Sequence, residues 1–220
     1  MKGPIEYIVE AWKIYTKKEN FIFFAKVMAV LTIISTSISY LYSYLYPFNY
    51  PNETIDYSNI PMVIGFVILT ILSVLVSLWS QSAKYFAIFK MGSNEIVVFK
   101  LGYKNIWKYL SISLVVGLIF FGGAILLIIP AFIFGVWYSF STFLVLDKKL
   151  GIKESLKRSK AMVSGNFWRI VGRYFVFGLF GFTISIALTT IPYVGSLLVS
   201  FIAPLFTLPF YLLYRDLSIN

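Results

Sequence analysis

The sequence predicts an all-α fold, a polytopic membrane helix bundle with six transmembrane helices. The chain has 220 residues, of which 59% are hydrophobic and 13% charged, about half the charged share of an ordinary soluble domain. A soluble fold of this size cannot bury so much apolar surface. The apolar residues gather in six runs that do not alternate with polar residues as barrel strands do. Helices are therefore favoured over a membrane barrel.

The six runs give the expected spans. A helix needs about 20 residues to cross a hydrocarbon core of about 30 Å. The fourth run is short, and the second can continue as helix to Lys90. The spans are expected at 21–46, 61–83, 110–129, 131–146, 170–191 and 194–214. The first run lacks a small-residue cleavage site, so we expect no cleaved signal peptide.

The distribution of cations predicts the orientation. The segments 47–61, 122–130 and 189–196 contain no Lys or Arg. All nineteen cations lie in or beside the N-terminal lead, in 84–108, in 148–173 or at Arg215. Cytoplasmic loops are enriched in Lys and Arg. We therefore expect a multi-pass protein of the cell membrane, with both termini and both long connections in the cytoplasm.

An internal repeat is indicated where the odd-numbered spans begin. Each of these spans follows an Asn, and a Pro comes 25 to 27 residues later. The three pairs are Asn20 and Pro47, Asn105 and Pro130, and Asn166 and Pro192. Since an Asn side chain can cap free backbone N–H groups, each Asn should open a helix and each Pro should mark an outer turn. The prediction is one integral membrane domain, 1–220, built from three amphipathic-helix-plus-hairpin units at about 1–90, 91–147 and 148–220.

Two segments outside the predicted spans, the N-terminal lead and the 148–173 connection, have the pattern of amphipathic helices. The apolar stripe of the N-terminal lead consists of Ile5, Ile8, Trp12 and Tyr15. The stripe of the 148–173 connection consists of Ile152, Leu156, Ser159 and Val163. Glu154 is spaced to pair with Arg158. Such helices lie in the membrane interface with their cations toward anionic headgroups. The expected headgroup contacts are Lys153, Lys157, Arg158, Lys160, Arg169 and Arg173. The alternative, compatible with the first, is a solvated connector packed on the inner end of the bundle.

The second predicted span carries a polar stripe at helical spacing. Its members are Ser73, Ser77, Ser80, Gln81 and Lys84. Polar groups within a membrane turn inward, where they hydrogen-bond across helices or line cavities. We expect these side chains to join helices inside the bundle near its inner end, with a polar vestibule as the alternative. No Asp or Glu falls at mid-membrane in the predicted spans, which leaves a carboxylate-driven ion relay unsupported.

Residues 127–170 carry the most distinctive local pattern of the chain. It comprises Ile129-Pro130, Asp147, Gly151, the stretch ESLKRS at 154–159 and the stretch NFWR at 166–169. This region resembles the membrane-domain family found fused to some bacterial glycerophosphoryl diester phosphodiesterases, and its stand-alone six-span relatives. The chain departs from that family at Ala131, where Gly is usual, and at Ser155, where Ala is usual. The resemblance implies an integral membrane protein, mostly without assigned activity, and not the phosphodiesterase chemistry of the soluble partner domain, which needs histidines.

Composition narrows the expected function further. The chain has no Cys and no His, which excludes thiolate chemistry, zinc-finger sites and His-based acid–base catalysis. The net charge is +10, and the cations that give rise to it lie between apolar segments. Anionic lipid is therefore a better partner than nucleic acid. We expect a non-enzymatic membrane protein without cofactor, catalytic or metal-binding residues, which contacts anionic lipid or a partner protein through its basic cytoplasmic helices. The alternative is a transporter or channel for a small solute or lipid, which needs a polar path to mid-membrane from both sides.

Overall fold

The structure, a computed structural model, is built from helices and describes residues 1–46, 60–192 and 194–219. The helices are α1 (Pro4–Thr16), α2 (Lys18–Leu45), α3 (Ile60–Phe89), α4 (Glu95–Lys104), α5 (Ile106–Leu126), α6 (Ile128–Trp137), α7 (Ser141–Asp147), α8 (Ile152–Ser164), α9 (Phe167–Thr189) and α10 (Gly195–Ile219). Six helical stretches are long and apolar enough to cross a membrane: α2, α3, α5, α6 with α7, α9 and α10. The predicted all-α class and the number of candidate spans are confirmed.

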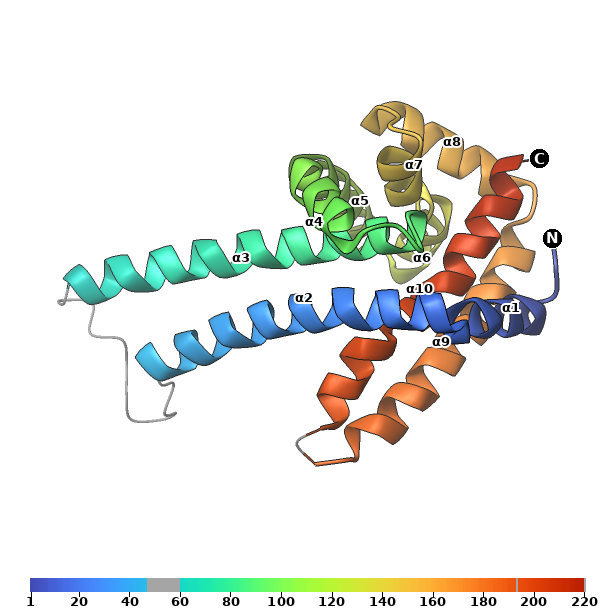
Figure 1. The fold of residues 1–220 in the computed structure, drawn as a ribbon. Coiled ribbons are helices and arrows are strands. Elements are labelled where there is room, and N and C mark those ends of the chain that lie inside the picture. Colours follow the sequence, from blue (N-terminus) through green and yellow to red (C-terminus); the bar gives the residue numbers. More distant parts are fainter. Residues whose placement is uncertain (47–59, 193, 220) are drawn as a thin grey trace.

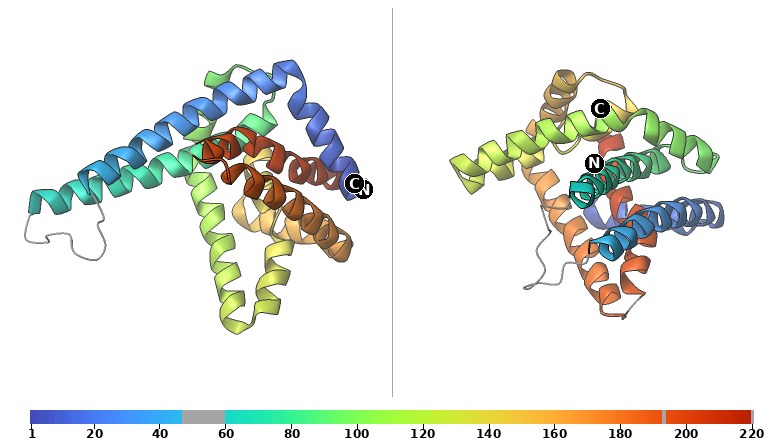
Figure 2. Two further views of the ribbon diagram at one scale, coloured as in Figure 1. Left: turned by 90° about the horizontal axis from the view of Figure 1, so that it is seen from below. Right: turned by 90° about the vertical axis from the view of Figure 1, so that its left-hand side faces the viewer.

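The six spans pair as three antiparallel hairpins that leave a common base. Figure 1 shows α2 and α3 running side by side to the left, while α9 and α10 run toward the bottom. Figure 2 shows α5 and α6 leaving the base in a third direction. A short helix, α1, α4 or α8, precedes each hairpin in the chain. This order is the one expected of three units, but whether the units are repeats of one another stays a prediction.

The core of the protein lies in the base. Its largest fully buried side chains include Tyr7 of α1, Phe24 of α2 and Tyr214 of α10. Aromatic rings join α3, α7 and α10, and the rings of Phe143 and Tyr214 stack with their centroids 5.2 Å apart. The outer parts of the hairpins instead expose apolar side chains, such as Phe121, which is 67% exposed. Apolar surface of this kind suits a hydrocarbon environment.

The N-terminal segment is fastened to the C-terminal helix and to α9, and both ends of the chain lie at the base (Figures 1 and 2). The Tyr7 hydroxyl donates to Asp216 Oδ2 at 2.7 Å, and Arg215 pairs with Glu10 at 3.7 Å. Arg173 of α9 donates from Nε to the Lys2 carbonyl at 3.0 Å. The termini therefore lie at the same end of the molecule.

The fourth span is divided into two helices. Residues 138–140 form a turn between α6 and α7, so this span is helical at both ends and interrupted inside. At its other end, α6 folds back on α5 through the single extended residue Leu127. The two helices approach so closely that a Cβ built on Gly123 would lie 2.9 Å from the backbone of Ala131, a distance that a non-glycine residue cannot hold without displacement.

Asn105 and Asn166 stand at the N-cap positions of α5 and α9, as predicted, but none of the three Asn side chains makes the expected capping bond. Asn20 lies in the first turn of α2 and donates from Nδ2 to the Ile14 carbonyl at 2.8 Å. Asn105 stands directly before α5, but its Nδ2 donates to the Leu101 carbonyl at 2.9 Å. Asn166 makes no side-chain cap either, and accepts from Arg169 at 3.4 Å. At the first two junctions the preceding helix ends at the same place, and its free carbonyls attract the amide donor.

The three prolines of the predicted repeat have different outcomes. Pro130 lies in the first turn of α6, immediately after the hairpin turn. Pro192 is exposed between α9 and α10. Both are therefore at or beside an outer turn, as predicted. Pro47 lies outside the described residues.

Candidate functional site

The amphipathic helix α8 docks on the divided fourth span. Its buried face consists of Ser155, Ser159 and Val163, each with no exposed surface, whereas Ile152 and Leu156 are only partly buried. The predicted stripe is therefore correct for Ser159 and Val163 and shifted by one residue at Ser155. The face that packs on the protein is small and polar rather than broadly apolar, so α8 fits closely against α6 and α7.

Ser159 bridges the interruption between α6 and α7. Its hydroxyl donates to the Trp137 carbonyl at 2.7 Å and accepts from the Phe140 N–H at 3.2 Å. A helix interruption leaves backbone groups without intrahelical partners, and here one side chain satisfies a donor and an acceptor together. On the other side, the hydroxyls of Ser139 and Tyr174 are 2.7 Å apart. The interruption is thus held by α8 and α9.

The cations of α8 lie away from the buried face, although Arg158 is close enough to Tyr214 of α10 for an electrostatic interaction. Lys153, Lys157 and Arg158 are exposed, and among the described residues none of them forms an ion pair or hydrogen bond. The predicted pair between Glu154 and Arg158 is therefore not formed. Lys160 is exposed too, but its ammonium lies 4.1 Å from the centre of the Trp137 ring, a cation–π contact. Three unpaired cations thus stand on a helix whose opposite face is fixed.

The two arginines of α9 have structural contacts. Arg173 binds the Lys2 carbonyl through Nε and Nη2 and donates from Nη1 to the Arg169 carbonyl. Most of its donors are already directed at backbone carbonyls, and its lipid contact stays a prediction. Arg169 is exposed and has one long bond of 3.4 Å to Asn166. Arg169 also follows Trp168, which is 77% exposed, and exposed Trp side chains favour the headgroup level.

The predicted apolar stripe of α1 packs on the protein only in part: Tyr15 is buried and Ile8 is partly buried against the core. The buried face is Tyr7, Ala11 and Tyr15, whereas Ile5 and Trp12 are exposed. Tyr15 also donates to the Phe201 carbonyl at 3.2 Å. Burial, and then the bond to Asp216, raises the pKa of Tyr7 to about 12. The buried face of α1 is therefore fixed to α9 and α10, and Ile5 and Trp12 of the predicted stripe remain exposed.

The inner connection between the first two hairpins is fixed by an ion pair. Lys26 of α2 pairs with Glu95, the first residue of α4, at 3.2 Å. Hydrogen bonds from the Glu95 backbone N–H and from Lys26 hold the pKa of the Glu95 carboxyl below its usual range. Both side chains are partly exposed, and exposed pairs contribute under about 1 kcal/mol. This pair thus orients α4 more than it stabilises the protein.

The polar stripe predicted on the second span is not gathered inside the bundle. Ser77 and Gln81 are exposed, and Ser73 Oγ donates to the Leu69 carbonyl of its own helix at 2.8 Å. Because α3 leaves the base beside α2 (Figures 1 and 2), one neighbour cannot cover the whole stripe. Nearer the base, Ser80 and Lys84 do line a partly open cavity between α2, α3 and α10. The stripe is therefore an interior feature at its inner end and a surface feature beyond it.

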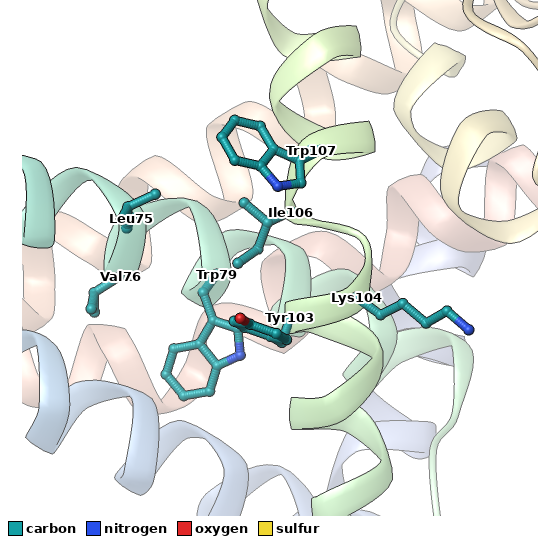
Figure 3. Close-up of a pocket in the computed structure, with 7 residues that line it drawn as sticks. All are labelled: Leu75, Val76, Trp79, Tyr103, Lys104, Ile106 and Trp107. Atoms are coloured by element: carbon teal, nitrogen blue, oxygen red, sulfur yellow. The ribbon is translucent and has the colours of Figure 1, made fainter.

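A separate pocket of about 470 Å³ lies where α3 meets α4 and α5 (Figure 3). Its lining consists of Leu75, Val76, Trp79, Tyr103, Lys104, Ile106 and Trp107. The Trp79 indole N–H donates to the Phe99 carbonyl at 3.1 Å, which fixes the wall made by that ring. Figure 3 shows Lys104 extending away from the other side chains. The pocket therefore offers apolar and aromatic surface, and its form suits a hydrocarbon chain more than a polar solute.

Comparisons with protein-family models, with curated proteins and with solved structures gave no match. The family resemblance of residues 127–170 therefore stays a prediction.

Proposed function

We propose that this chain is a non-enzymatic integral membrane protein whose cytoplasmic base binds anionic lipid headgroups through α8. The observation that carries the proposal is the set of three exposed, unpaired cations, Lys153, Lys157 and Arg158, on a helix held in place by Ser159. Residues 147–173 contain eight cations and only two carboxylates, Asp147 and Glu154. Because the backbone of α8 is already fixed, little conformational freedom is lost when a headgroup binds to these cations. Anionic lipid is their natural counter-ion.

The position of α8 supports the same proposal. Two residues, Gly165 and Asn166, separate its end from α9, where the exposed Trp168 marks the headgroup level. The cationic face of α8 is therefore near that level. We include in this proposal that the chain belongs to the membrane-domain family that residues 127–170 resemble. Members of that family are integral membrane proteins, which agrees with a base at the membrane surface.

The test compares two triple variants of equal charge change. In the first, Lys153, Lys157 and Arg158 become Gln; in the control, Lys13, Lys17 and Lys18 near the N-terminus become Gln. Each cation near an anionic headgroup contributes about 1 kcal/mol, so the α8 variant should bind phosphatidylglycerol on the order of 100-fold more weakly at this site. Both proteins should fold, because the substituted side chains are exposed.

The readout is the amount of phosphatidylglycerol or cardiolipin that co-purifies with each protein in detergent. Loss of anionic lipid from the α8 variant with retention in the control supports the proposal. Equal retention, or equal loss, in the two variants contradicts it, because a general charge effect does not distinguish α8 from the N-terminal lead. The orientation of each variant is measured in parallel, since cations also set topology.

A further inference from the structure

A polar cavity lies inside the membrane-spanning part of the protein, apart from α8. It has a volume of about 150 Å³, is lined by residues of α2, α3 and α10, and is partly open at its surface. Its lining consists of Met28, Leu31, Thr32, Ser35, Thr36, Ser80, Lys84 and Ser200. Since about 10–15 Å³ of such volume admits one water molecule, the cavity is large enough for a small polyatomic group. Five hydroxyls and one ammonium face it, and no carboxylate is among the lining residues.

Most of these polar groups have no partner in the protein. Within residues 1–46, 60–192 and 194–219, Lys84 forms no ion pair or hydrogen bond, and the hydroxyls of Thr32, Ser35, Thr36 and Ser80 form none either. This differs from hydroxyls elsewhere in the spans, several of which donate to a carbonyl one turn earlier in their own helix. The unpaired hydroxyls are therefore available to a ligand in the cavity.

The depth of Lys84 fits the inner edge of the hydrocarbon layer. At the outer end of the hairpin, the Tyr46 hydroxyl donates to the Met62 carbonyl, and its ring packs on Phe66 at 5.4 Å. Lys84 lies 18 residues beyond Phe66 along α3, which corresponds to about 27 Å at 1.5 Å per residue. That distance is close to the ~30 Å hydrocarbon thickness. Lys84 thus reaches the level at which lipid phosphates begin.

The chemistry of the cavity selects an anion. An ionised group inside a membrane protein needs a counter-charge or a polar partner, and the described residues provide no counter-charge for Lys84. Its ammonium repels cations, while the surrounding hydroxyls can all donate to an oxygen-rich anion. Lysine is a common phosphate-binding side chain, acting as a point charge. A phosphate group satisfies the ammonium and several hydroxyls at once.

We propose that this cavity binds a phosphate group, with Lys84 as the charged partner and Thr32, Ser35 and Ser80 as hydroxyl donors. The group is either the headgroup phosphate of a lipid or free inorganic phosphate. The site lies on α2, α3 and α10, so it does not depend on the cations of α8. The cavity is open to one ligand group of this size, and it needs no metal or cofactor.

The experiment uses the full chain in detergent and measures the thermal unfolding midpoint with three additives. These are inorganic phosphate, with chloride at equal ionic strength as reference; short-chain phosphatidylglycerol; and the matching short-chain diacylglycerol, which lacks phosphate. The variant is Lys84→Gln. The control is Lys90→Gln, which removes an exposed charge just beyond the same helix.

A midpoint that rises with both phosphate compounds in the wild type and in Lys90→Gln, but not in Lys84→Gln, identifies a site for free phosphate. A rise with phosphatidylglycerol alone, again lost in Lys84→Gln, identifies a lipid headgroup site. No rise with either compound, or an undiminished rise in Lys84→Gln, overturns the proposal. If the rise is undiminished in Lys84→Gln, the lipid effect belongs to another site such as α8, and the role proposed for α8 is not affected.

A measurement on the wild type alone covers the case in which Lys84→Gln does not fold. Acetylation of Lys84 and Lys90 is followed by mass spectrometry with and without the phosphate compound. We expect bound phosphate to slow the labelling of Lys84 by at least roughly fivefold and to leave Lys90 unchanged, since an occupied ammonium is withheld from the reagent. Equal labelling of Lys84 in the presence and absence of ligand contradicts the site.

Discussion

Replacing Ser159 with Ala should strongly destabilise the base of this protein. The hydroxyl is fully buried and binds both the Trp137 carbonyl, at 2.7 Å, and the Phe140 N–H, at 3.2 Å. Alanine fills nearly the same space but leaves a donor and an acceptor unsatisfied at the interruption of the fourth span. A buried unsatisfied polar group costs about 1–3 kcal/mol, so the two together should cost about 2–6 kcal/mol.

This expected cost is larger than that of an average interhelical hydrogen bond in a membrane. Such bonds average about 0.6 kcal/mol, because the separated helices find other partners. The backbone groups of Trp137 and Phe140 lie at an interruption, where the helix itself cannot supply a replacement. The full penalty of an unmade bond therefore applies.

Ser155 provides a matched control on the same helix. It is equally buried, but its hydroxyl donates only to the Ile152 carbonyl of α8, at 2.7 Å. Ser155→Ala should cost under about 1 kcal/mol, since it removes one local bond and gains the higher helix propensity of Ala. The free energy of unfolding is measured by denaturant titration in mixed micelles with tryptophan fluorescence, to which Trp137 contributes. If Ser159→Ala is no more destabilising than Ser155→Ala, the bridging role of Ser159 is refuted.

Two further predictions follow from the base. Gly102→Ala should destabilise the protein by about 1–3 kcal/mol, because the new Cβ would lie 2.9 Å from the Ala83 Cα; the control Gly117→Ala, which meets no atom within 4 Å, should be neutral or stabilising in the same unfolding measurement. Tyr7 has its pKa raised to about 12, so its contribution is fully present below about pH 10 and is lost as the pH rises toward 12. The wild type should therefore lose stability over that range more steeply than Tyr7→Phe, and equal pH profiles would show that Tyr7 does not contribute.

Properties that depend on length and composition could be predicted from the sequence. The spans follow from apolar runs of about 20 residues, and each predicted span overlaps one observed helical stretch. The inner end of the first span was less well predicted: α2 begins at Lys18, three residues before the expected start, whereas α3 continues to Phe89, as the expected extension toward Lys90 allowed. Composition alone does not place such ends.

Features that depend on tertiary contacts could not be predicted in the same way. On α1, the Ile5 and Trp12 stripe and the Tyr7 and Ala11 stripe both have helical spacing, and only packing decides which one meets protein. In a membrane protein either apolar stripe can face lipid, so periodicity does not separate the two. The turn at 138–140 also has no Gly or Pro to signal it, and it is stabilised by Ser159, about 20 residues away in sequence.

The candidate sites show the same limit. The α8 cations were evident as a charge cluster, but the structure separates the free Lys157 from Lys160, which stacks on Trp137. On α3, Lys84 was identified together with Gln81 because both are polar and similarly placed. Only Lys84 faces the cavity, since its environment comes from α2 and α10 as well as from its own helix.

The most direct test of the account is the sidedness of the base relative to the hairpin turns. The chain has no cysteine, so single substitutions such as Lys100→Cys, Lys153→Cys, Asn52→Cys and Thr190→Cys can each be labelled in intact cells with a membrane-impermeant maleimide. We predict labelling at 52 and 190 from outside, and labelling at 100 and 153 only after the cells are opened. Labelling of 52 and 153 from the same side would contradict the six-span topology with a cytoplasmic base.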